Sequence, residues 1–167
     1  MYKVAIEGIY GNPTLKVSFL SFDSRIIQKD SLYVAQRGLR VDGHEFIPQA
    51  IEKGAKAIVC EEIPDNRQEN IVYVLVKNTS KALGIIASNF YDNPSQKIDL
   101  IGITGTNGKT SIASLLYQLF TKQGYDCGLL STVNIQYGDK IYKNSNTTPD
   151  SIVLNEHLNN MVKSGIT

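Results

Sequence analysis

Residues 105–111 have types and an order that suit the binding of phosphate. Backbone N–H groups of a glycine-rich turn and of the helix that follows it point at one position, where the helix dipole favours negative charge. Lys109 would neutralise phosphate oxygens, which makes it the candidate catalytic residue, and the Thr110 hydroxyl would ligate a bridging Mg²⁺. The predicted ATP-binding residues are Gly105, Thr106, Asn107, Gly108, Lys109, Thr110 and Ser111.

This segment does not meet the strict P-loop pattern, because Ile103 stands where the pattern requires its first glycine. No G-x-G-x-x-G fingerprint of dinucleotide-binding proteins runs through it either. The alternative is an ordinary turn that uses glycine and asparagine for backbone conformations with positive φ. That alternative explains the glycines but not a Lys-Thr pair at the position of a phosphate and a metal ion, so phosphate binding is favoured.

The segments on either side of the loop are those that a phosphate site requires. Residues 98–103 are rich in β-branched apolar side chains and are predicted to form a buried strand. After the loop, apolar residues recur at helical spacing up to about Lys122, and Gly124 is the stop signal. Strand, loop and helix therefore follow one another in the order expected of a nucleotide-binding fold.

The composition is that of an ordinary globular protein, with 42% hydrophobic and 20% charged residues. A net charge of +1 gives no broad attraction to nucleic acid or to a membrane, so neither is an expected partner. No apolar run reaches membrane-spanning length and the N-terminus starts no signal peptide, so a cytoplasmic location is expected. Cys60 and Cys127 lie in apolar runs and are predicted to be free thiols. The spacing of cysteine and histidine does not suit zinc.

Strands and helices alternate along the first half of the chain, which predicts an α/β sheet. The expected strands are residues 17–22, 31–35, 57–60 and 71–76, and the expected helices are residues 43–53 and 80–91. The polar segment 91–97 contains Asn93-Pro94, which disfavours a continuing helix. We therefore expect one domain in residues 1–95 and a second in residues 96–167.

The second half predicts a further strand at residues 127–131 and a hairpin that turns at Gly138-Asp139. Thr148 is the predicted N-cap, and Pro149 the first residue, of a helix that runs to about Lys163. A parallel α/β unit would enter its next strand after that helix. The second domain is therefore expected to be an incomplete P-loop α/β domain of a longer protein.

Four segments of this chain, taken in order, resemble the Mur ligases of bacterial cell-wall synthesis, and among them the MurE type. They are the DSR motif in residues 22–25, the DGH segment in residues 42–47 with Gly54-Ala55, the G-x-TGTNGKT loop in residues 102–111, and the NTTP segment in residues 146–149. The family's ATP loop departs from the general P-loop pattern as this one does at Ile103. The DSR and DGH segments point to MurE or its sibling MurF, and Asn107 and the NTTP segment favour MurE.

The resemblance implies a ligase that uses ATP and Mg²⁺ to add a diamino acid, diaminopimelate or lysine, to UDP-N-acetylmuramoyl-L-alanyl-D-glutamate through an acyl phosphate. It implies a Rossmann-like UDP-binding domain, then a truncated P-loop domain. We expect a monomer, and no ligase activity from these 167 residues alone. The implied substrate contacts are Phe22, Ser24, Asn146, Thr147 and Thr148, and Leu39, Arg40 and Val41 stand where the family places a uridine-contacting loop.

Each of these segments also has an ordinary structural explanation. Asp23-Ser24 would form an Asx-type turn, and Asp42 would cap the helix that follows it. His44 and His157 are assigned structural positions, neither with an evident acidic partner. The four segments in the right order favour the ligase. Two alternatives remain: a sibling ligase such as MurF, and a non-catalytic module that binds a UDP-sugar or a nucleotide.

Overall fold

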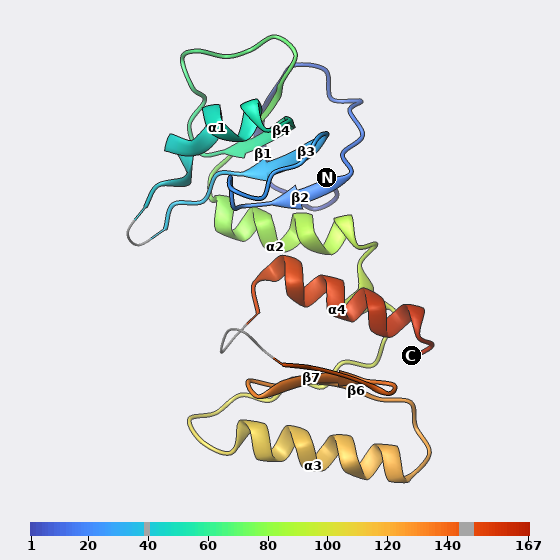
Figure 1. The fold of residues 1–167 in the computed structure, drawn as a ribbon. Coiled ribbons are helices and arrows are strands. Elements are labelled where there is room, and N and C mark those ends of the chain that lie inside the picture. Colours follow the sequence, from blue (N-terminus) through green and yellow to red (C-terminus); the bar gives the residue numbers. More distant parts are fainter. Residues whose placement is uncertain (39–40, 144–148) are drawn as a thin grey trace. The chain divides into compact units, whose positions relative to one another are not determined.

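The computed structural model describes residues 1–38, 41–143 and 149–167. It divides into two compact units, Met1–Phe90 and Tyr91–Thr167, which are described separately below (Figure 1). The first unit packs helices against a mostly parallel sheet, and the second combines helices with a small sheet. The α/β fold class predicted from the sequence is confirmed.

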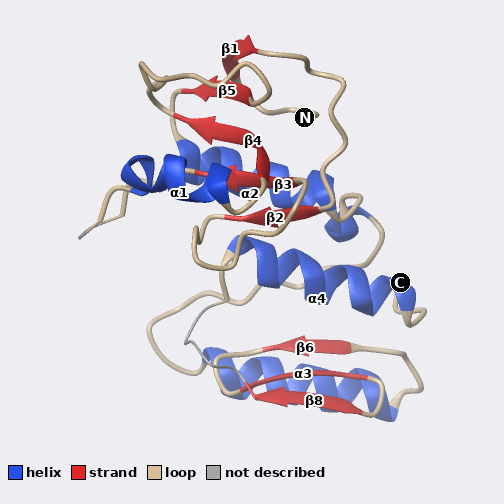
Figure 2. Ribbon diagram, turned by 45° about the horizontal axis from the view of Figure 1, so that its top comes forward, coloured by secondary structure: helices blue, strands red, loops and turns tan. Residues whose placement is uncertain are grey.

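A five-stranded sheet is the centre of the first unit. Its strands, in spatial order, are β1 (Ile6–Tyr10), β5 (Val72–Val76), β4 (Ala55–Cys60), β3 (Ser31–Val34) and β2 (Phe19–Ser21). Neighbours from β5 to β2 pair in parallel, and β1 pairs antiparallel with β5. The helices α1 (Ile47–Glu52) and α2 (Thr79–Phe90) cover opposite faces of this sheet (Figure 2).

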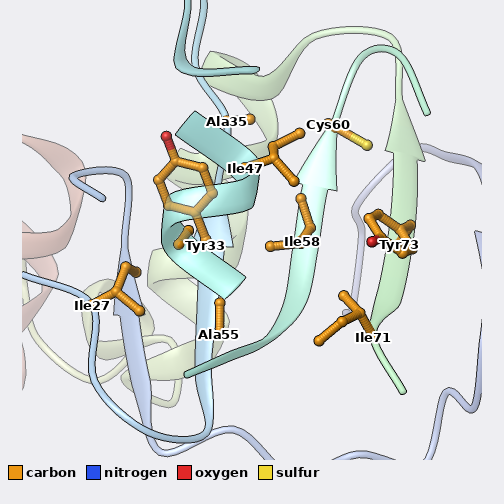
Figure 3. Packing of buried hydrophobic residues seen from close by; sticks show 10 residues of the cluster. Ile27, Tyr33, Ala35, Ile47, Ala55, Ile58, Cys60, Ile71 and Tyr73 are labelled. Carbon is orange, nitrogen blue, oxygen red and sulfur yellow. The ribbon is translucent and has the colours of Figure 1, made fainter. Parts of the chain in front are cut away.

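The core of this unit follows from strands that are apolar on both faces. All of β3 and nearly all of β4 are buried, as expected of strands covered by helices on both sides. One cluster, between α1 and the sheet, is shown in Figure 3. Its buried members are Ile27, Tyr33, Ala35, Ile47, Ala50, Ala55, Ile58, Cys60, Ile71 and Tyr73. Burial of each large apolar side chain contributes about 1.5–3 kcal/mol, so this cluster is a main source of the unit's stability.

Two elements of the first unit differ from the sequence expectation. The predicted helix over residues 43–53 is a 3-10 turn, η1 (Gly43–Phe46), followed by the short helix α1. The strand β1 was not predicted, because it is half exposed and Gly8 interrupts its apolar pattern. An edge strand of this kind shows little of the periodicity on which sequence reasoning depends.

The second unit has a three-stranded antiparallel sheet, formed by β6 (Gly128–Leu130), β7 (Asn134–Tyr137) and β8 (Lys140–Lys143) in that order. The predicted hairpin is confirmed, since Tyr137 pairs with Lys140 across the turn at Gly138-Asp139. The helix α4 (Ser151–Lys163) supplies the other half of a small core. That core consists of Ile135, Tyr137, Leu158, Met161 and Ile166.

The strand predicted over residues 98–103 is not formed. Leu100 and Ile101 are 60% and 61% exposed, and no described strand pairs with this segment. A strand requires a neighbour to take its backbone hydrogen bonds, and β6, the nearest candidate along the chain, pairs with β7 alone. The apolar run therefore indicates a segment suited to burial, but no described strand pairs with it.

The N-cap of α4 also differs from the prediction. Asp150, not Thr148, caps this helix: its Oδ1 accepts hydrogen bonds from the N–H groups of Ile152 and Val153, both at 2.9 Å. Pro149 accordingly precedes the cap and is not the first helical residue. A carboxylate at this position satisfies two of the unpaired N–H groups and also favours the positive end of the helix dipole.

The helix α3 (Lys109–Lys122) has the bounds that its sequence periodicity predicted, but it buries none of its side chains. The apolar residues Ile112, Leu115 and Leu119 are about half exposed or more. None of the described helices is both long and apolar enough to cross a membrane.

Candidate functional site

The predicted phosphate loop precedes α3 directly. Gly105 and Gly108 have φ angles of 148° and 79°, and Gly108 is the N-cap of α3. A Cβ at either position would meet nothing closer than 3.7 Å, so the backbone conformation rather than crowding favours glycine here. No side chain of a described residue caps α3, which leaves the N–H groups of its first turn available to an anion.

The Lys109 and Thr110 side chains lie at this same end of α3. The Lys109 ammonium donates to the carbonyl oxygens of Gly105 and Thr106, so it folds back over the loop. The hydroxyl of Thr110 lies 3.1 Å from that of Thr132, which follows β6. The Lys109 side chain is therefore held against the loop backbone, and the Thr110 side chain contacts the segment after β6.

The hydroxyl oxygen of Thr110 suits Mg²⁺ bound beside a nucleotide, and not a metal ion that is coordinated by protein side chains alone. Mg²⁺ prefers oxygen ligands and keeps several waters, so one or two protein oxygens are enough to hold it beside a nucleotide. The Thr110 hydroxyl can give its proton to Thr132 and present a lone pair to the cation. Among the described residues, no group of three or more His, Cys, Asp or Glu could hold a metal ion.

In the first unit, the predicted substrate residues Phe22 and Ser24 follow the carboxyl end of β2. Ser24 is 6% exposed and donates to Oε1 of Gln49 on α1 at 2.7 Å. Asp23 accepts from the backbone N–H of Arg25 at 2.9 Å, which is the Asx turn that the sequence allowed. The side-chain hydrogen bond from Arg25 lowers the pKa of Asp23. Ligands of open α/β sheets bind at this carboxyl edge of the strands.

The DGH segment forms the next part of that edge. Asp42 caps η1, because its Oδ1 accepts from the backbone N–H of His44 at 2.9 Å. The same oxygen lies 2.6 Å from Nδ1 of His44, so the expectation that this histidine lacks an acidic partner is wrong. Hydrogen bonds from the backbone and from the ring of His44 lower the pKa of Asp42. The Nε2 atom of His44 accepts from the backbone N–H of Glu61 at 2.8 Å.

Glu61 extends this set of contacts from the end of β4 to the start of α2. Its Oε1 accepts from the backbone N–H and the hydroxyl of Thr79, at 2.8 and 2.9 Å. Burial would raise the pKa of Glu61, but the two hydrogen bonds from Thr79, together with the nearby charge of Arg37, lower it. The Arg37 guanidinium lies 3.5 Å from Asp42 and 3.6 Å from Glu61. We call Arg37, Asp42, His44, Glu61 and Thr79 the carboxyl-edge network.

The predicted site residues are divided between the two units. The ATP-loop residues belong to the second unit, whereas Phe22 and Ser24 belong to the first. Val41 is 54% exposed on the first unit. Five predicted contacts lie outside the described residues: Leu39, Arg40, Asn146, Thr147 and Thr148. The remaining histidine, His157, lies on α4 with Nδ1 3.4 Å from the Tyr137 hydroxyl.

Sequence reasoning missed three residues that the structure places at these sites. Glu61 directly follows a buried strand, which is a position that could have been recognised as the carboxyl edge of the sheet. Gln49 and Thr132 carry no such signal, because each reaches its partner only through the fold.

Comparisons with known proteins match both units to one family. The model described as "Mur ligase family, catalytic domain" matches residues 16–91, and the "Mur ligase middle domain" model matches residues 103–167. A 2,6-diaminopimelate ligase for UDP-N-acetylmuramoyl-L-alanyl-D-glutamate from Cytophaga hutchinsonii is 49% identical over the whole chain. Relatives of the same name from Bacteroides fragilis and Clostridioides difficile are 45% and 40% identical over 94% and 96% of the chain.

The chain spans about a third of the length of these relatives: 35%, 32% and 33%, respectively. A solved structure of a ligase with the same name has a TM-score of 0.71 at 21% identity, covering 90% of this chain and 30% of its own. A MurF structure from Acinetobacter baumannii has a TM-score of 0.55 at 22% identity, covering 88% of this chain and 28% of its own. At such identities the two structures support the fold alone.

Proposed function

The chain belongs to the Mur ligase family, and on that premise we propose that it carries the UDP-substrate site and part of the ATP site of a cell-wall ligase. The ligase adds a diamino acid to UDP-N-acetylmuramoyl-L-alanyl-D-glutamate. The names of the relatives support 2,6-diaminopimelate as that diamino acid. In this proposal residues 1–95 form the UDP-substrate domain and residues 96–167 the first part of the ATP domain.

Amide formation from a carboxylate requires an activated acyl group. The proposed reaction transfers the γ-phosphoryl group of ATP to the D-glutamate carboxylate, and the amine of the diamino acid then displaces phosphate from the acyl phosphate. Lys109 and the N–H groups of residues 105–111 would bind the phosphates and offset the charge on the transferred oxygens. Mg²⁺, held by Thr110, would add positive charge at the same phosphates.

The first unit would bind the nucleotide end of the substrate at the carboxyl edge of its sheet. Phe22 and Ser24 are the proposed contacts there, and their position after β2 supports this assignment. Asn146, Thr147 and Thr148 are proposed to contact the muramoyl part near its reacting end. For the 167 residues alone we expect binding of the UDP-linked substrate without formation of product.

The uncapped start of α3, with Lys109 and Thr110 on its first turn, is the observation that carries this proposal. The test uses the full-length ligase that contains this chain. Substitution Lys109→Ala should lower kcat for tripeptide formation by about a hundredfold or more, the usual loss for one preorganised charge contact. Lys122→Ala, at the opposite end of the same helix, is the matched control and should leave kcat unchanged. A Lys109→Ala enzyme within threefold of the wild type would refute the proposed role.

A further inference from the structure

The His44 side chain connects two segments that are distant in the sequence. Its ring lies between the Asp42 carboxylate, 2.6 Å from Nδ1, and the backbone N–H of Glu61, 2.8 Å from Nε2. Asp42 belongs to the turn that follows β3, whereas Glu61 follows the last residue of β4. The side chain is only 14% exposed, so both contacts are largely shielded from water.

These two contacts indicate which ring nitrogen donates and which accepts. Nε2 accepts a hydrogen bond from a backbone N–H and therefore carries no proton. Nδ1 faces a carboxylate, which only accepts, so the single ring proton lies on Nδ1. His44 is thus a neutral imidazole with one donor and one acceptor, and both are used.

The turn that His44 anchors has a defined backbone. Gly43 donates to the carbonyl of Gln36 at 2.7 Å, and Gly38 donates to the carbonyl of Val41 at 3.0 Å. The described residues 36–38 and 41–43 therefore run antiparallel beyond the carboxyl end of β3. Since β3 lies next to β2 in the sheet, this turn borders the end of β2, where Phe22 and Ser24 follow.

Other side-chain contacts between this turn and the end of β4 are ion pairs of Arg37, which lies 3.6 Å from Glu61 and also pairs with Glu62. Within the turn, Arg37 lies 3.5 Å from Asp42, and both of these side chains are more than a third exposed. Such a surface pair contributes only a small stabilisation, whereas a shielded hydrogen bond to a carboxylate contributes more. His44 is therefore the better shielded of these links between the turn and the end of β4, because Arg37 is 47% exposed and His44 only 14%.

We propose that His44 is a positioning residue for substrate binding: its neutral ring bridges Asp42 to Glu61 and so holds the turn of residues 36–38 and 41–43 against the nucleotide end of the substrate. This inference rests on the proposed function of the first unit. It assigns a binding role to a side chain that contacts no substrate atom itself.

The bridge is tested by removing its two ends one at a time. In His44→Gln, the side-chain amide oxygen reaches about as far as Nε2 and can still accept from Glu61. In His44→Asn, the amide can donate to Asp42 but does not reach Glu61. Because a bridge needs both ends, these variants and His44→Ala should each weaken binding of UDP-N-acetylmuramoyl-L-alanyl-D-glutamate about tenfold, by calorimetry on the 167-residue chain. Glu45→Gln, at the exposed neighbouring residue, is the matched control and should bind as the wild type does.

A second measurement reads the ring directly and needs no ligand. Nitrogen-15 spectra of the wild-type chain at neutral pH should show a protonated Nδ1 and an unprotonated Nε2, with slow exchange of the Glu61 amide proton. A ring protonated at Nε2, or a His44→Gln variant that binds as tightly as the wild type, would overturn the bridge. A wild-type chain that shows no binding of the UDP-linked substrate would overturn the proposed UDP site and, with it, this role. Equal binding by the wild type and all three variants would overturn the positioning role alone.

Discussion

Substitution Gly43→Ala should destabilise the first unit strongly, although the φ angle of this glycine is not in the left-handed region. A Cβ placed on Gly43 would lie 2.6 Å from the carbonyl oxygen and 2.7 Å from the nitrogen of Gln36. Both are backbone atoms two residues beyond β3, so neither can rotate away as a flexible side chain could. The backbone segments around Gly43 and Gln36 must therefore separate, which shifts Asp42 and His44 on either side of Gly43.

The size of the effect follows from the contacts that this movement disturbs. The Gly43 N–H donates to Gln36 at 2.7 Å, and the Gly43 carbonyl accepts from the Tyr33 hydroxyl at 2.9 Å. Tyr33 is 1% exposed, so its hydroxyl has no water to replace the lost partner. At about 1 kcal/mol for each hydrogen bond, with added backbone strain, the unfolding free energy should fall by about 2–3 kcal/mol. For a unit of this size, that corresponds to a Tm lower by about 10–20 °C.

The measurement is thermal unfolding by circular dichroism, combined with hydrogen exchange of peptides from β3 and β4, which report on the first unit alone. Gly102→Ala is the matched control, because a Cβ there meets nothing within 4 Å and its φ is not left-handed. It should change Tm by no more than about 2 °C, as surface substitutions usually do. A Gly43→Ala chain that unfolds within 2 °C of the wild type would refute the reasoning.

Three further outcomes are expected. Because the pKa of Glu61 is lowered in the folded chain, its ionised carboxylate stabilises the fold fully above the ordinary pKa range of glutamate, and this stabilisation is lost as pH falls through the lowered pKa. The fall of Tm with decreasing pH should therefore be less steep in Glu61→Gln than in the wild type. Burial raises the pKa of the Cys60 thiol to about 11, so mass spectrometry after alkylation at pH 8 should find Cys127 modified and Cys60 intact until the chain unfolds. Asp150→Ala should lower the unfolding free energy of the second unit by about 1 kcal/mol in a denaturant titration, and no change would contradict its role as the N-cap of α4.

Local chemistry in the sequence predicted the elements that depend on neighbouring residues. The hairpin at Gly138-Asp139 formed as expected, since the turn residues themselves determine it. The helix α3, which ends at Lys122, has the expected bounds because its apolar periodicity and the glycines on either side of it are local signals. The N-cap of α4 was the exception: Thr148 and Asp150 are both good capping residues, and only the hydrogen bonds from the first turn distinguish them.

Features that depend on distant partners could not be predicted in this way. The apolar pattern of residues 98–103 indicates a preference for burial, but it does not say which strand lies beside them. The contact of His44 with Glu61 likewise exists only because β4 lies next to β3. The contact of His44 with Asp42 could have been predicted, because Asp42 was already expected to cap the following helix. A spacing of two residues, however, suggests neither a shared helix face nor a metal site, and capping was considered only as a bond from Asp42 to the backbone.

The antiparallel edge strand β1 constrains the order in which the first unit can fold. Ile6 pairs with Val76, whereas the parallel strands pair over much shorter stretches, such as Leu20 with Leu32 and Val59 with Val74. Closing the longest loop costs the most chain entropy before any contact is gained. The strand β1, which precedes the other strands of this sheet in the chain, is therefore expected to join the sheet last. Until β1 has paired with it, β5 presents an open strand edge, and such an edge can pair with a strand of another partly folded chain.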